Sequence, residues 1–214
     1  MEKVAVCCRG KSLKSISLLP SIDTFITVNE FTDELKVPGV SNALSDTPIT
    51  HMFNWWNYTN IIPQMTAQKF YTKYNVTSIV SPYTKEAGIG VYNIQGRDGI
   101  IPFMYYPDEL KPYMWYNENS RYKWDFPSCG NGAILYGAAL ASKELHIIGL
   151  DFFQQGVHGY ASGAVETKGH NGDIMKKFLI EQVFEVFNDT QFYLYTCADV
   201  DNTPSNVKVI QVEQ

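Results

Sequence analysis

The stretch SCGNGAILYGAALASKELHIIGLDFF, residues 128–153, most constrains what this chain can fold into. It opens with a turn of small residues, continues as an apolar helix through Ala141 and ends in the apolar strand LHIIGLD. A helix followed closely by a buried strand is typical of parallel sheets, because a parallel connection needs a crossover that a helix can supply. The segment therefore predicts an α/β fold.

The same alternation recurs along the chain. Short apolar strands are predicted over 3–10, 24–31, 49–56, 76–82, 191–197 and 207–212, and helices over 11–22, 67–74 and 172–189. The stretch between residues 83 and 127 is rich in Gly, Pro, Tyr and Asn, and its weak periodicity assigns no element. The pattern indicates a doubly wound, Rossmann-like, mostly parallel sheet covered on both faces. A length of 214 residues suits a single domain over 1–214.

Polar residues fall where several of the predicted strands end. They are Arg9 with Gly10, Asn29, Asn54 and Asp151. Ligands of doubly wound sheets bind outside the carboxyl ends of the strands, near the point where the strand order reverses. The asparagine amides suit a base or a ribose, although isolated asparagines at such positions are more often turn formers. Asp151 fits either a ligand contact or a cap on the following segment.

Two turns of small residues precede helices. CCRGKS, residues 7–12, sets Arg9 and Ser12 beside backbone N–H groups that suit a phosphate, although it matches neither common phosphate-loop pattern and an ordinary connection fits as well. SCGNGA sets Cys129 and Gly130 where a ligand can approach the backbone, and helix-to-sheet packing is the rival explanation. His170 opens the helix at 172–189, where a neutral imidazole can accept a proton or simply lie at the surface.

Composition narrows the function classes. The net charge is -5 and the 17 basic residues form no run longer than two, so nucleic-acid binding is not expected. No apolar run approaches the length of a membrane span, and the first residues do not read as a secretion signal, so we expect a cytoplasmic protein. The four cysteines lack metal-binding spacing, and the pair Asp199 and Asp201 fits a turn-rich loop better than a metal site, so no metal is expected.

Taken in order, these motifs resemble the bacterial sialyltransferases of glycosyltransferase family 42, which use CMP-sialic acid. CRGKSLKSI matches the family's first turn, TVNEF and MFNWW match strands that end in nucleotide-binding asparagines, and residues 127–156 match a small-residue helix and the strand after it. Tyr160 and KGHNGDI, residues 168–174, match the family's lid and the end of that lid. The resemblance spans most of the chain and is most specific over 149–174.

The chain departs from the family pattern at several positions. Arg9 and Cys8 replace an asparagine and a glycine of the first turn, and Phe153 replaces the first of two leaving-group tyrosines. Phe126 stands where the family has an arginine, and Cys129 stands where it has a serine. The interval from Asp151 to His170 is also short, so the resemblance implies a shortened lid over 152–171 on a variant of the GT-A architecture.

The resemblance implies an inverting transfer of sialic acid, or a related nonulosonic acid, from a CMP-sugar to a glycan hydroxyl, with no metal and no cofactor, by a homo-oligomer. It assigns His170 as general base and Tyr160 as the group assisting the phosphate. It assigns donor binding to Arg9, Gly10, Ser12, Asn29, Asn54, Cys129, Gly130 and Asp151. Two alternatives stay open: a non-catalytic nucleotide or glycan binder, and an ATP- and magnesium-dependent enzyme like the pterin diphosphokinases.

Overall fold

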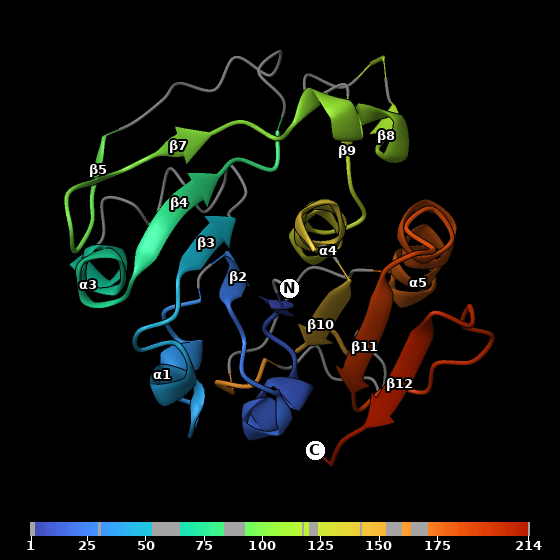
Figure 1. The fold of residues 1–214 in the computed structure, drawn as a ribbon, viewed down its shortest axis with the longest axis horizontal. Coiled ribbons are helices and arrows are strands. Elements are labelled where there is room, and N and C mark those ends of the chain that lie inside the picture. Colours follow the sequence, from blue (N-terminus) through green and yellow to red (C-terminus); the bar gives the residue numbers. More distant parts are fainter. Residues whose placement is uncertain are drawn as a thin grey trace.

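The central element is an eight-stranded, wholly parallel sheet in the order β12-β11-β10-β1-β2-β3-β4-β7 (Figure 1). The computed structural model describes residues 3–29, 31–52, 65–83, 93–116, 118–119, 124–141, 143–152, 160–163 and 171–213. The strands are β1 (Lys3–Cys7), β2 (Thr24–Val28), β3 (Ile49–Met52), β4 (Val76–Val80), β7 (Phe103–Met104), β10 (Glu144–Ile148), β11 (Gln191–Thr196) and β12 (Val207–Gln211). The predicted α/β class with a parallel sheet is confirmed.

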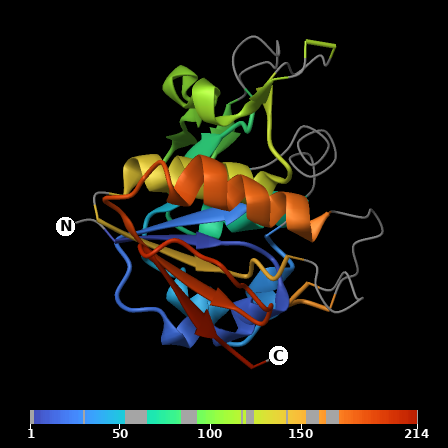
Figure 2. The same cartoon turned by 90° about the vertical axis from the view of Figure 1, so that its right-hand side faces the viewer.

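Helices cover both faces of the sheet, as predicted (Figure 2). One face carries α4 (Cys129–Leu140), α5 (Gly172–Leu179) with the π-helical turn Ile180–Phe184, and the 3-10 segment Asp108–Tyr113. The other carries the 3-10 segment Lys11–Leu18, the short helix α1 (Val40–Ala43) and α3 (Met65–Lys73). Alternate residues of a strand point to opposite faces of the sheet. In β1, Val4 and Val6 pack on the face that carries α4, whereas Ala5 and Cys7 pack on the other face.

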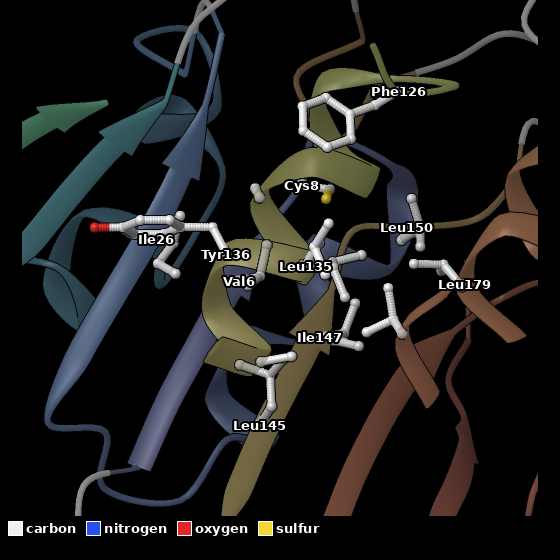
Figure 3. Packing of buried hydrophobic residues seen from close by; sticks show 14 of the residues in the cluster. Val6, Cys8, Ile26, Phe126, Leu135, Tyr136, Leu145, Ile147, Leu150 and Leu179 are labelled. Atoms are coloured by element: carbon white, nitrogen blue, oxygen red, sulfur yellow. The ribbon is translucent and has the colours of Figure 1, made fainter. Parts of the chain in front are cut away.

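Helix α4 packs closely on the sheet because it carries small residues where it meets the strands. Figure 3 shows the side chains of Val6, Leu145 and Ile147 gathered against Leu135 of α4. A Cβ on Gly137 would lie 3.0 Å from Val6 and 3.1 Å from Leu145, so the glycine permits this approach. This close packing holds α4 directly on β1 and β10.

Two predicted helices differ from regular α-helices. Residues 11–18 form 3-10 turns, with Ser15 outside helical geometry, because the segment is short and its buried Leu13 and Ile16 lie three positions apart. The predicted helix over 172–189 starts as α5 and changes after Leu179 into the π-helical turn, in which the Glu185 N–H donates to the Ile180 carbonyl oxygen at 3.1 Å.

The stretch without assigned elements contains very short ones. β5 (Ile94–Gln95) pairs with β6 (Ile100–Ile101), and β8 (Trp115–Tyr116) pairs with β9 (Trp124–Asp125), both antiparallel. Two-residue strands show no periodicity, which is why the sequence did not reveal them. Among the described residues, no helix combines the length and apolar character needed to cross a bilayer.

Candidate functional site

The order of strands reverses between β1 and β10, which lie side by side although most of the chain separates them. From β1 the chain builds β2, β3, β4 and β7 on one side, and from β10 it builds β11 and β12 on the other. Doubly wound sheets bind ligands at such a switch point. The predicted residues Arg9, Gly10 and Asp151 follow these two strands, so the structure brings them to the expected place.

The two strand ends are held against each other by their backbones. The Cys8 N–H donates to the Ile148 carbonyl oxygen at 2.8 Å, and the Gly10 N–H donates to that of Gly149 at 2.7 Å. A Cβ on Gly10 would lie 2.5 Å from the Asp151 Oδ2, and Gly149 has a φ of +77°. Both positions therefore require glycine.

Asp151 organises the turns around the switch point. Its Oδ2 accepts the Ser12 backbone N–H at 2.8 Å, and its Oδ1 accepts the Cys197 backbone N–H at 3.0 Å and the Thr196 Oγ1 hydroxyl at 3.1 Å. The predicted cap on the segment after Asp151 stays a prediction, because residues 153–159 lie outside the described ones; with these three bonds the carboxylate ties the 3-10 segment to the end of β11. Its contact with a donor stays a prediction.

The Ser12 side chain points toward the turn after β10. Its Oγ accepts the Gly149 backbone N–H at 2.9 Å, and the side chain is fully buried. Ser12 therefore joins the β1 turn to the β10 turn. Its predicted role in donor binding is left untested by this contact.

Asn29 and Cys129 come together at the ends of β2 and β3. Asn29 follows β2 with a φ of +53°, which asparagine tolerates better than most residues, and its N–H donates to the Met52 carbonyl oxygen at 2.7 Å. The Cys129 Sγ lies 3.8 Å from the same carbonyl oxygen. Two predicted donor-binding residues thus meet around the last residue of β3.

Cys129 and Gly130 form the first turn of α4, which Ser128 caps. The Ser128 Oγ accepts the Asn131 backbone N–H at 3.2 Å, and the Gly130 Cα lies where an added Cβ would be 3.1 Å from the Cys8 Sγ. Burial raises the pKa of the Cys129 thiol well above its usual range and that of Cys8 to about 12. Both thiols are therefore protonated near neutral pH and are not nucleophiles.

Tyr160 lies against the turn after β1. It pairs with Gly10 in an antiparallel bridge, and the Arg9 guanidinium carbon lies 4.1 Å from the centre of its ring. The Arg9 Nε donates to the Glu34 Oε2 at 2.9 Å. The structure thus joins the predicted Arg9, Gly10 and Tyr160, and it adds Glu34, which sequence reasoning missed.

Asn54, Phe153 and His170 lie outside the described residues. The first residue of the predicted lid 152–171 and the residue after the lid are described: an added Cβ on Gly172 would clash with the Phe152 carbonyl oxygen, so these two positions lie together. Asn171 caps α5 by accepting the N–H groups of Asp173 and Ile174 at 3.0 and 3.2 Å. His170 is therefore the residue directly before this cap in the sequence.

The two histidines of the described part lie inside the sheet. His51 in β3 and His146 in β10 are both buried, as the position of His51 within a predicted strand implied. Within the described ranges, no three His, Cys, Asp or Glu side chains come together as they would around a metal ion. Asp199 and Asp201 lie in the loop between β11 and β12.

The fold is shared with solved sialyltransferase structures. The sialyltransferase CST-II, in complex with a trisaccharide acceptor and CMP, aligns with a TM-score of 0.58 at 16% identity, over 90% of this chain and 80% of that one. CstII from Campylobacter jejuni, in complex with the substrate analogue CMP-3FNeuAc, aligns with a TM-score of 0.56 at 17% identity, over 91% and 81%. No protein-family model and no curated protein sequence matches the chain. The resemblance that the motifs indicate is therefore confirmed at the level of the fold: this chain has the fold of the CstII sialyltransferases.

Proposed function

We propose that this protein is a sialyltransferase-like glycosyltransferase that transfers sialic acid, or a related nonulosonic acid, from a CMP-sugar to a glycan hydroxyl. The observation that carries the proposal is the gathering of Gly10, Asn29, Cys129 and Tyr160 around the carboxyl ends of β1, β2 and β3, in a fold shared with sialyltransferases that bind CMP. The donor nucleotide lies across these strand ends in the proposal, and the glycan acceptor approaches from the lid side.

The proposed chemistry uses two groups of the segment after β10. CMP is a stable anion at neutral pH, so its departure needs hydrogen bonds more than a proton, and the Tyr160 hydroxyl supplies one. The acceptor hydroxyl is a weak nucleophile, and His170 accepts its proton as it attacks the anomeric carbon. Direct displacement inverts that centre. The segment 152–171 acts as a lid that brings both groups to the donor.

One observation favours the non-catalytic alternative. Phe126 occupies the position where the family has an arginine, and its ring is buried against Tyr106 and Phe178 at centroid distances of 4.8 and 6.2 Å. An added Cβ on Gly132 would lie 2.8 Å from the same ring, so Phe126 is part of the core. A lost arginine weakens phosphate recognition, and a binder without turnover would tolerate this loss.

A binding experiment separates the two CMP-binding functions, transferase and non-catalytic binder, from the kinase-like alternative. CMP, ADP and ATP are titrated into the protein by calorimetry and thermal shift, each with magnesium and with EDTA, because a ligand of the native state raises its melting temperature. The proposal predicts that CMP binds in EDTA and that Asn29→Ala weakens the binding by about tenfold, the loss of one to two hydrogen bonds. Binding of ATP with magnesium alone would support the kinase-like alternative.

A further inference from the structure

We propose that Glu34 is a positioning residue that holds Tyr160 at the switch point, acting through Arg9 and Ser162. The inference rests on the proposed function, in which Tyr160 assists the departing phosphate. It adds a residue that the family motifs do not include. Glu34 is the first residue of the 3-10 turn Glu34–Lys36, which follows β2.

The two carboxylate oxygens of Glu34 accept hydrogen bonds from two different residues. Its Oε2 accepts the Arg9 Nε–H at 2.9 Å, and its Oε1 accepts the Ser162 hydroxyl at 2.7 Å. The carboxylate is fully buried and Arg9 is 8% exposed. Glu34 therefore connects the turn after β1 with the segment 160–163, which follows β10 in the chain.

Arg9, which Glu34 holds in place, contacts the ring of Tyr160. A guanidinium 4.1 Å from a ring centre is attracted by the electrons of the ring, and its flat shape restricts how the ring can lie. The backbone supports the same contact, because the Ala161 N–H donates to the Arg9 carbonyl oxygen at 2.7 Å and the Gly163 N–H to that of Tyr160 at 3.0 Å. Tyr160 is thus held through its ring on one side and its backbone on the other.

The charges explain why this arrangement is specific. Removing Glu34 and Arg9 from water is costly, so a buried pair is a poor source of stability, but each charge needs the other in one geometry. Burial raises the pKa of Glu34, while Arg9 and the Ser162 hydroxyl act in the opposite direction. A buried pair of this kind defines one position for the residues that contact it, here Tyr160 and Ser162.

The first test measures the contact without any ligand. Hydrogen exchange is followed in peptides covering 160–163 and 191–196, in wild type, Glu34→Gln, Ser162→Ala and the control Asp33→Asn. Asp33 is a neighbouring carboxylate in an exposed pair with Lys36. We expect exchange over 160–163 to rise by on the order of tenfold in the first two variants and to stay unchanged in the control.

The outcomes are distinct. Unchanged exchange over 160–163 in both Glu34→Gln and Ser162→Ala would overturn the inference. If exchange also rises over 191–196 in Glu34→Gln, that substitution has disturbed the fold of the variant. The exchange of 160–163 in Ser162→Ala is then the deciding result, since Ser162→Ala removes only one of the bonds to Glu34. Faster exchange over 160–163 in both variants, together with no CMP binding by wild type, would support the contact and contradict the proposed function.

The second test separates positioning from donor binding. CMP release from a CMP-sugar is measured in EDTA, and Glu34→Gln should lower kcat by on the order of tenfold while donor KM changes by less than about twofold. In a Tyr160→Phe background the same change should lower kcat no further, because the two residues act through one contact. A raised KM at unchanged kcat, or an equal loss in both backgrounds, would overturn the inference.

Discussion

His51 should make the protein lose stability as the pH falls from 7 to 5. The ring is buried in β3, shares a 2.8 Å hydrogen bond with the Thr27 hydroxyl through Nδ1, and meets Phe70 and Tyr71 edge-on. Burial lowers its pKa from 6.5 to about 3, although a backbone hydrogen bond involving Asn29 acts the other way. The folded protein therefore keeps His51 neutral at a pH where the unfolded chain protonates it.

The change in the free energy of unfolding with pH follows from the difference between the His51 pKa values of the folded and unfolded states. Because the unfolded state binds the proton first, the contribution of His51 is full above pH 6.5 and is lost progressively as the pH falls toward 3. Between pH 7 and pH 5 the loss is about 2 kcal/mol. With a urea m-value of about 2 kcal/mol/M, the unfolding midpoint shifts down by ~1 M.

Urea unfolding at the two pH values checks this expectation. His51→Gln removes the titration, so its midpoint should shift by ~1 M less than that of wild type. Thr27→Val is the matched control: it keeps the ring and should cost about 1 kcal/mol at both pH values. The reasoning is refuted if His51→Gln loses as much stability as wild type between pH 7 and pH 5.

Three further predictions concern the switch point. Ser128→Ala removes the cap of α4 and should lower the free energy of unfolding by about 1 kcal/mol in urea titrations, with little change expected for the exposed Ser45→Ala. Gly10→Ala forces a Cβ to 2.5 Å from the Asp151 Oδ2, so CMP should no longer raise the melting temperature; an unchanged CMP shift would count against the placement of the donor. Because burial raises the pKa of Cys8 to about 12, iodoacetamide should label it slowly in the native state at pH 8 and rapidly in urea, as mass spectrometry of the tryptic peptide would show; fast native labelling would contradict the buried thiol.

The sequence predicted the sheet well because its strands are short, apolar and buried on both faces. β1, β2 and β11 each fall within a predicted strand, β10 begins one residue before the predicted strand 145–151, and α4 begins at the predicted small-residue turn. A strongly apolar run beside a glycine-rich turn is compatible with few secondary structures other than a buried strand or helix. The short strands β5 to β9 were missed because two-residue elements depend on pairing with distant residues rather than on local pattern.

The candidate site was predictable where strand ends define it and hidden where long-range contacts do. Arg9, Asn29 and Asp151 were found because polar residues after buried strands stand out. Glu34 lies 25 positions from Arg9, in a loop that shows no motif, so only the structure reveals their ion pair. Its one signal was a carboxylate shortly after a predicted strand end, on the strand next to that of Arg9.

Donor turnover is the most direct test of whether this protein is a transferase. CMP-sialic acid is incubated in EDTA with the wild-type chain and with His170→Ala, and CMP release is followed by ion-exchange chromatography, with and without a trisaccharide acceptor. We expect wild type to release CMP faster when the acceptor is present, and His170→Ala to release it about 100-fold or more slowly than wild type. Binding of CMP without any release by wild type would contradict the account and identify a nucleotide-binding relative without transferase activity.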